Sequence, residues 1–348
     1  MVEIKDYLPS LVIWEITLKC NLKCLHCGSS GGKARINELS TKESLKLCKD
    51  LAELGFKGIA LVGGEPFLRK DWYVLAKKIK DLGMKLSIVS NGFVDGKKIV
   101  PELTKLEADS VQISLDGASS QLHDSIRGVN GSFKKAVEFL RLSKNAGLST
   151  GAITTISKMN FNELLDLKKF IINERIDWQI QEAVPIGRFP KKMVLSELEY
   201  YALGLFIAFN QKKYSSEGIF IRGPHNLGFH SRLIPRLGSY PEWKGCWAGR
   251  TVLGIQSNGN VKGCLALSDD FIEGNVRKRN IIDIWNDPNA FEFNRKFKKQ
   301  DLGKNCTGCK YGEICKGGCT TRSNILTGKL HNDCHCYYRI ENSHLIKK

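Results

Sequence analysis

The sequence lacks a long hydrophobic run and a recognisable export signal. Its longest apolar stretch, around residues 202–209, is flanked by charged side chains and is far shorter than the roughly 18 apolar residues of a membrane span. The first six residues, Met-Val-Glu-Ile-Lys-Asp, do not have the pattern of a signal peptide. We therefore expect a cytoplasmic protein that does not enter a membrane.

The chain also lacks a fourth cysteine where three occur together. Cys20, Cys24 and Cys27 lie in the run Cys-Asn-Leu-Lys-Cys-Leu-His-Cys, just after an apolar run at 11–18 that predicts a buried strand. Cubane iron–sulfur clusters usually bind four cysteines, and a metal site with one open position is typical of a catalytic centre. A zinc knuckle completed by His26 is the alternative interpretation, because structural zinc takes four ligands.

Twelve cysteines occur among the 348 residues. In a cytoplasmic chain, this number indicates metal ligands rather than disulfides. Eleven fall into two groups, at 20–27 and 246–336, whereas Cys48 lies on an apolar helix face and is expected to pack in the core.

The formal net charge of +17 would suit nucleic acid or another acidic partner. Thiolates bound to clusters would lower this charge, and the lysines are scattered over predicted helices. A solvated basic surface is therefore the favoured interpretation, and nucleic acid is not an expected partner.

Between residues 11 and 182, short β-branched runs alternate with amphipathic helical patterns. Such repeated units indicate a parallel sheet, and six of them are too few for a closed eight-fold barrel. The first helix is expected to begin at a capping box of Ser40 and Glu43, with Gly55 as its C-terminal cap. The expected strands lie at 11–18, 58–62, 85–89, 110–115, 149–156 and 176–181, and the expected helices near 40–54, 71–82, 97–106, 132–145 and 160–173.

The second cysteine group has regular spacings. Its core is Cys-x2-Cys-x5-Cys-x3-Cys, and a glycine stands five positions before its second member. Two zinc-ribbon sites are the alternative interpretation, because CxxC pairs are common zinc ligands. The members are Cys246, Cys264, Cys306, Cys309, Cys315, Cys319, Cys334 and Cys336.

The first loop resembles the CxxxCxxC signature of the radical S-adenosylmethionine (SAM) superfamily, and the second group resembles the SPASM domain that follows the barrel in some members. The resemblance implies an α/β protein with a partial (β/α)6 TIM-like barrel at 1–195, a bridging helical region at 196–240 and a SPASM domain at 241–348. It implies a [4Fe-4S] cluster on the three N-terminal cysteines, whose open iron binds SAM. Reduction, by a flavodoxin or ferredoxin, then generates a 5′-deoxyadenosyl radical.

Loops after the next strands are similar to the superfamily's SAM-binding motifs. The run Gly63, Gly64, Glu65 matches the GGEP motif that contacts the SAM amino group, and glycines let a backbone approach a ligand closely. Ser90 and Ser114 are implied SAM contacts, and Asp116 is implied at the ribose end. A plain Asp-Gly turn is an equal alternative for Asp116. Arg127 matches the arginine that pairs with the SAM carboxylate, a task that suits a guanidinium. The alternative for Arg127 is a surface arginine in a loop.

The SPASM resemblance implies two auxiliary [4Fe-4S] clusters. It assigns Cys306, Cys309, Cys315 and Cys334 to one, and Cys246, Cys264 and Cys319 to the other. Residues 247–253 contain no cysteine where some relatives have a further ligand, so the latter cluster is either open at one iron or completed by Cys336 or a non-cysteine ligand. The sequence leaves open whether Cys334 or Cys336 closes the former cluster.

The implied reaction is homolytic abstraction of hydrogen inside a cavity that excludes water. Auxiliary clusters suit an oxidative outcome, and we expect the substrate to be a ribosomally made peptide, with any leader bound by a separate protein or by the barrel. The first alternative is the same chemistry on an acidic small molecule, such as an aminosugar or a tetrapyrrole side chain. A zinc-stabilised nucleic-acid-binding protein is the alternative of another class. Leu265 stands where sulfatase-maturing relatives carry an aspartate, which disfavours formylglycine formation.

Overall fold

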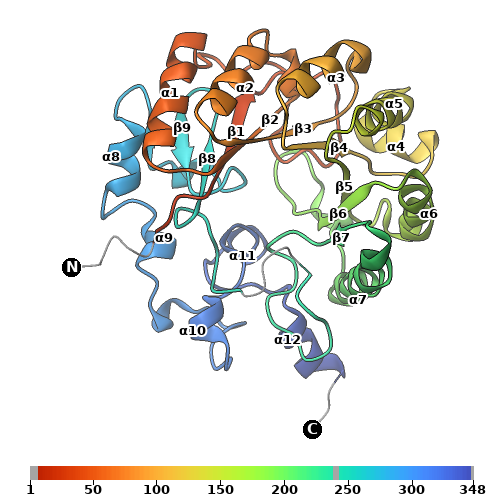
Figure 1. Ribbon diagram of the computed structural model, residues 1–348. Coiled ribbons are helices and arrows are strands. Elements are labelled where there is room, and N and C mark those ends of the chain that lie inside the picture. The colour runs from red at the N-terminus through yellow and green to blue at the C-terminus, as the bar shows by residue number, and fades with distance from the viewer. Residues whose placement is uncertain (1–6, 238–242, 346–348) are drawn as a thin grey trace.

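A curved sheet of ten strands lies at the centre of the computed structural model, which describes residues 7–237 and 243–345 (Figure 1). The strands are β1 (Leu11–Thr17), β2 (Gly58–Gly63), β3 (Lys85–Ser90), β4 (Ser110–Ser114), β5 (Thr150–Ile156), β6 (Asp177–Glu182), β7 (Ile221–Arg222), β8 (Val252–Ile255), β9 (Asn260–Lys262) and β10 (Gly274–Asn275). Their order is β10-β9-β8-β1-β2-β3-β4-β5-β6-β7. From β8 to β7 every pair is parallel, and β9 pairs antiparallel with both of its neighbours. The sheet is open, because its edge strands β7 and β10 do not pair with each other.

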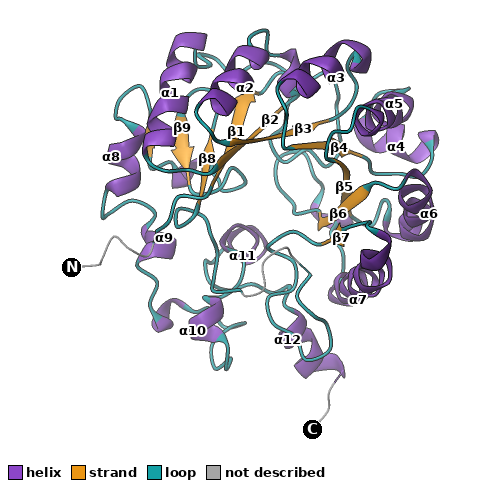
Figure 2. Cartoon of the chain, in the orientation of Figure 1, coloured by secondary structure: helices purple, strands orange, loops and turns teal. Residues whose placement is uncertain are grey.

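Helices cover the outer face of the sheet, and shorter helices near the C-terminus lie across its open side (Figures 1 and 2). The outer helices are α1 (Thr41–Glu53), α2 (Trp72–Asp81), α3 (Gly96–Lys105), α4 (Ser120–Arg127), α5 (Ser132–Asn145), α6 (Leu164–Glu174), α7 (Glu197–Tyr214) and α8 (Ile281–Asn286). The others are α9 (Glu292–Arg295), α10 (Gly312–Cys315), α11 (Thr320–Thr327) and α12 (Tyr337–Ile340). Among the described residues, no helix has both the length and the apolar character that crossing a membrane requires.

The expected parallel β-α architecture is confirmed. The six expected strands occur as β1–β6, and the five expected helices occur as α1, α2, α3, α5 and α6. Helix α4 and strands β7–β10 were not predicted from the sequence. Strands β7 and β10 have only two residues each, which is too short to show a periodic pattern. The sheet runs through all three predicted segments, since β7 lies in 196–240 and β8–β10 lie in 241–348. The predicted boundary at 240, like the first six residues, lies outside the described residues.

The first helix begins and ends as expected. The Ser40 hydroxyl accepts a hydrogen bond from the Glu43 N–H, and the Glu43 carboxylate accepts one from the Ser40 N–H, so the capping box is present. Gly55 follows the helix with a left-handed φ of 87°, a conformation that glycine adopts without strain. Cys48 is fully buried among apolar neighbours, and burial raises the pKa of its thiol to about 12. Its predicted role in core packing is confirmed.

Alternating strand residues separate the core from the inner surface of the sheet. In β6, Trp178 and Ile180 are fully buried, whereas Gln179 and Gln181 are half-buried. Successive side chains of a strand point to opposite faces, so the apolar set packs beneath the helices and the amides face inward. The inner face of β6 is therefore polar and partly exposed, unlike the packed apolar interior of a closed parallel barrel. Other strands place half-buried apolar side chains on this face, as Val62, Val89 and Ile153 show.

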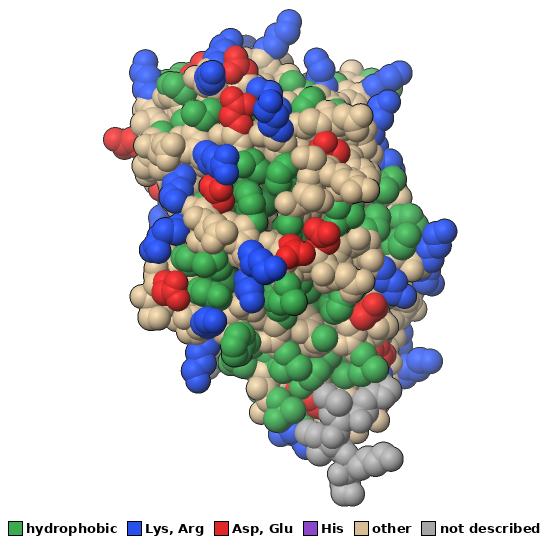
Figure 3. All heavy atoms as spheres, turned by 90° about the vertical axis from the view of Figure 1, so that its right-hand side faces the viewer, with side chains coloured by type: hydrophobic (Ala, Val, Ile, Leu, Met, Phe, Trp, Pro, Cys, Tyr) green, Lys and Arg blue, Asp and Glu red, His purple; other side chains and the backbone are tan. Residues whose placement is uncertain are grey.

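The charged surface is mixed. On the face shown in Figure 3, Lys and Arg side chains are dispersed among acidic and apolar ones rather than gathered into one patch. Several lysines are paired within their own helices, as Lys77 is with Asp81 at 2.8 Å. Exposed pairs of this kind contribute about 0–1 kcal/mol to stability.

We predict that Trp178→Ala lowers the free energy of unfolding by about 3–5 kcal/mol, because the fully buried indole would leave a cavity. The substitution also removes the hydrogen bond from indole Nε1 to Thr154 Oγ1, which is 2.7 Å long. Urea denaturation under anaerobic conditions measures the change. Leu165→Ala, at a side chain that is 58% exposed, is the control and should cost less than about 0.5 kcal/mol. Equal denaturation midpoints for the two variants would contradict this account of the core.

Candidate radical SAM and auxiliary cluster sites

The loop after β1 carries the first three cysteines, and every one of their sulfurs accepts a hydrogen bond. The backbone N–H of Gly31 donates to Cys27 Sγ (3.3 Å), Asn91 Nδ2 donates to Cys20 Sγ (3.7 Å) and Arg127 Nη1 donates to Cys24 Sγ (3.7 Å). Burial raises the pKa of the Cys20 and Cys24 thiols, but these donors favour the thiolate, which is the form that binds iron. The donor set therefore fits an iron–sulfur cluster.

The glycines of the predicted GGEP motif are required by the cluster loop itself. A Cβ on Gly64 would lie 2.3 Å from the Lys19 carbonyl oxygen, and one on Gly63 would lie 2.2 Å from that of Thr17. The N–H of Gly64 also donates to the Thr17 carbonyl at 2.8 Å. These two glycines thus let the loop after β2 pack directly on the cluster loop, and their contact with SAM stays a prediction.

Glu65 and Ser90 point toward each other in the interior. The Glu65 carboxylate is 0% exposed and accepts hydrogen bonds from Ser90 Oγ (2.9 Å) and the Asn91 N–H (2.7 Å). Burial raises the pKa of Glu65 to about 7 although these donors oppose the shift. Glu65 therefore joins the ends of β2 and β3, while the predicted role of both residues toward SAM is untested.

Asp116 and Arg127 form a buried ion pair beside Cys24. The carboxylate oxygen Oδ2 of Asp116 lies 2.5 Å from Arg127 Nη2 and 3.2 Å from His26 Nε2. Burial opposes the ionisation of Asp116, but Arg127 and His26 together hold its pKa below the ordinary range. Arg127 lies at the end of α4 and is 7% exposed, so the alternative of a surface loop arginine does not apply. Ser114, at the end of β4, is half-buried, and SAM contacts of all three remain predictions.

The segment after β6 contacts the loop that carries the first three cysteines, although this segment was not identified from the sequence. Arg188 Nη1 donates to the Gly31 carbonyl (2.9 Å), its Nε donates to the Cys24 carbonyl (3.2 Å), and its N–H donates to that of Cys27 (3.1 Å). Gly187 has a φ of 59°, and a Cβ there would lie 2.3 Å from the Cys27 carbonyl oxygen. In the sequence, a Gly-Arg pair shortly after a proline indicates no more than a turn. Only the tertiary contacts show that Gly187 and Arg188 support the cluster loop.

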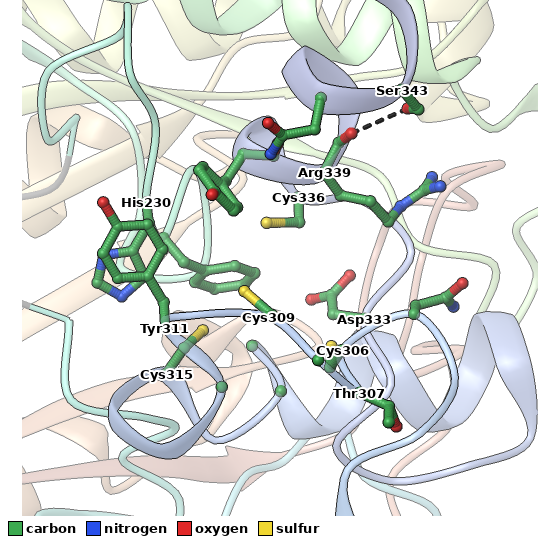
Figure 4. A pocket seen from close by; sticks show the side chains of 18 residues that line it. His230, Cys306, Thr307, Cys309, Tyr311, Cys315, Asp333, Cys336, Arg339 and Ser343 are labelled. Carbon is green, nitrogen blue, oxygen red and sulfur yellow. Dashed lines mark hydrogen bonds between the residues drawn. The ribbon is translucent and has the colours of Figure 1, made fainter. Parts of the chain in front are cut away.

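Four cysteines of the second group surround one cavity. Cys306, Cys309, Cys315 and Cys336 line a space of about 340 Å³ and point into it (Figure 4). Cys334 does not line this cavity, so the geometry favours Cys336 as the fourth member of this set, the choice that the sequence left open. The volume and the four thiols fit an auxiliary cluster.

The other three cysteines lie together in a neighbouring apolar cluster. Cys246 and Cys319 are buried there, and Cys264 packs against them. The Thr321 side chain lies beside the Cys264 thiol, which places a hydroxyl at the set that lacks a fourth cysteine. Within the described residues, no three His, Cys, Asp or Glu side chains lie close enough to share a single metal ion. The thiolates of a four-iron cluster each bind a different iron, so a cluster site does not require three ligands around one metal ion.

Comparisons with known proteins agree with this geometry. The family models of the radical SAM superfamily and of the SPASM iron–sulfur cluster-binding domain match residues 14–171 and 246–310. AdoMet-dependent heme synthase of Methanosarcina barkeri is 28% identical over 345 residues, which cover 95% of this chain and 97% of that protein. Mycofactocin maturase MftC of Mycobacterium tuberculosis is 30% identical over 324 residues, which cover 89% of this chain and 78% of that protein. The structure of Streptococcus suis SuiB bound to precursor peptide SuiA superposes with a TM-score of 0.77 at 20% identity. The match covers 95% of this chain and 76% of that one.

The chain belongs to the radical SAM superfamily and carries a SPASM domain. It is therefore an enzyme. Its cofactors are a [4Fe-4S] cluster with SAM, together with the two auxiliary [4Fe-4S] clusters typical of SPASM domains. The alternative of a zinc-stabilised nucleic-acid-binding protein is thereby set aside.

We predict that Cys336→Ser removes about four iron atoms per chain, because a cubane cluster loses a thiolate ligand. Cys334→Ser is the matched control and should retain full iron, since its side chain is not in the cavity wall. Iron and sulfide are measured after anaerobic reconstitution. Loss of iron from Cys334→Ser with retention in Cys336→Ser would reverse the assignment.

Proposed function

We propose that this enzyme oxidatively modifies a ribosomally made peptide within the open barrel. When bound, the first cluster and SAM supply a 5′-deoxyadenosyl radical that abstracts a hydrogen atom from the substrate. The residues of the chain bind and orient that substrate between the first cluster loop and the SPASM domain. The supporting observation is a group of polar side chains on the inner face of β4, β5 and β6.

That surface carries amide and hydroxyl groups on adjacent strands. Gln112 of β4, Thr155 of β5 and both Gln179 and Gln181 of β6 are half-buried. Gln181 Nε2 donates to Thr155 Oγ1 at 3.0 Å, and each group can both donate and accept hydrogen bonds. A peptide backbone presents the same complementary donors and acceptors. The relatives support this proposal as well, since one is a mycofactocin maturase and a neighbouring structure contains a precursor peptide.

An acidic tetrapyrrole is the second candidate substrate. It is favoured by the match to AdoMet-dependent heme synthase, which extends over 95% of this chain and 97% of that protein. Arg222 of β7 is half-buried beside Gln179, with Nε 3.5 Å from Gln179 Oε1. A guanidinium on the inner surface suits a substrate carboxylate.

We predict that replacing Cys20, Cys24 and Cys27 together by alanine abolishes formation of 5′-deoxyadenosine and removes about four of about twelve irons. The auxiliary sites lie in other segments of the chain, so their iron and sulfide should remain. Cys48→Ala is the control, because its thiol packs in the core and should affect neither quantity. Continued production of 5′-deoxyadenosine by the triple variant would disprove the site, as would a reconstituted protein that holds zinc and little iron.

Deuterium transfer tests the substrate class. The enzyme is incubated with SAM and an extract of source cells grown in deuterated medium, and deuterium in 5′-deoxyadenosine is measured by mass spectrometry. We predict that protease treatment of the extract before the assay abolishes the transfer, because a peptide substrate is destroyed. Gln181→Leu should reduce the transfer without reducing SAM cleavage in the absence of substrate. Transfer that survives protease would replace the peptide by the tetrapyrrole or another small molecule.

A further inference from the structure

Arg322 of α11 is a permanent charge enclosed in the interior. Its side chain is 0% exposed, and its main partners, Glu182 and Asp333, are each 1% exposed. The nitrogen Nη1 lies 2.9 Å from Glu182 Oε2, and Nη2 lies 2.9 Å from Asp333 Oδ2. Charges in such a place are screened far less than those at a surface. Arg322 is thus the cation of a buried three-charge group.

The remaining donors of the guanidinium are also occupied. Nε donates to Asp333, Nη1 donates to the Tyr200 hydroxyl (3.2 Å), and Nη2 donates to the His335 carbonyl (2.6 Å). The rings of Tyr200 and Phe229 lie 5.1 and 5.3 Å from the guanidinium carbon. The group is therefore held in one position on all sides, with no hydrogen-bond donor left for a substrate.

The three charges join three functional parts of the molecule. Glu182 is the last residue of β6 and belongs to the barrel. Asp333 lines the cavity of Cys306, Cys309, Cys315 and Cys336 (Figure 4), and its Oδ2 accepts the backbone N–H of Cys319 from the other cysteine set at 3.1 Å. Arg322 lies in the first turn of α11, whose N-cap is Cys319. Arg322 consequently lies between both auxiliary sites and the barrel.

Stability alone does not account for such a group. Replacement of a buried ion pair by packed apolar residues is often neutral or stabilising, because burial costs both charges their hydration. An enclosed cation does have a direct effect on a nearby redox centre, since it lowers the energy of the state that carries more negative charge. Reduction of a cluster creates that state, and the surrounding charge is one of the factors that set cluster potentials.

We propose that Arg322 is a positioning residue of the auxiliary clusters, which fixes both sites against the end of β6 and raises their reduction potentials through its enclosed charge. This role rests on the auxiliary clusters of the SPASM domain and not on the class of substrate.

The test is an anaerobic redox titration followed by electron paramagnetic resonance. The full chain carries alanine at Cys20, Cys24 and Cys27, so only the auxiliary clusters give a signal. Arg322→Gln should shift at least one midpoint potential negative by about 59 mV or more, a tenfold change in a one-electron equilibrium. Arg322→Lys, which keeps the charge, should stay close to the parent protein. Glu182→Gln removes an opposing negative charge and should shift the potential positive.

The three variants separate charge from structure. Equal shifts in Arg322→Gln and Arg322→Lys would overturn the electrostatic role, as would unchanged potentials in Arg322→Gln with full iron. If Arg322→Gln does not assemble clusters, Glu182→Gln becomes the deciding variant, because it leaves the Arg322–Asp333 pair intact. A zero or negative shift of the midpoint potential in Glu182→Gln would then refute the proposal. No substrate is present, so an error in the proposed substrate class leaves the result interpretable.

Discussion

The packing of backbone around the loop after β1 is the constraint on which the site depends. This loop carries three cysteines, and it is contacted from the β2 side by Gly63 and Gly64 and from the β6 side by Gly187 and Arg188. At these glycines a Cβ would lie within 2.4 Å of a carbonyl oxygen, so any larger residue would move the loop. The sulfurs are thus fixed by main-chain geometry from two separate strands.

Buried charge is the second organising feature. Near the first cluster loop, Asp116 is paired with Arg127 and also contacts His26. Near the auxiliary sites, Arg322 lies between two carboxylates. In both places the arginine that pairs with carboxylates also lies close to a candidate cluster ligand. Arg127 donates to the Cys24 sulfur, and Arg322 lies in the helix turn that follows Cys319. Arginine suits this arrangement because it stays protonated and donates in several directions at once.

The open sheet connects these two regions. Its outer face is apolar and packed beneath helices, while its inner face presents amides and hydroxyls from β4 to β6. The C-terminal helices lie across the open side (Figure 1), so the inner surface faces the cluster loop at one end and the auxiliary sites across the opening. The proposed reaction removes a hydrogen atom at one centre and an electron at another, and it requires a substrate held between them.

The sequence by itself determined the β-α order, because β-branched runs and amphipathic periods are local signals that survive in the fold as β1–β6 and their helices. It also determined the two cysteine groups and the class of cofactor, since motif spacing is local too. Strands β7 and β10 were not predictable, because two residues carry no period. Side-chain direction alone separates Cys336 from Cys334 at the auxiliary cavity. The contacts of Arg322 with Glu182 and of Arg188 with Cys24 join residues 140 and 164 positions apart, and only the tertiary structure could decide them, because such pairs leave no trace in the spacing of the chain.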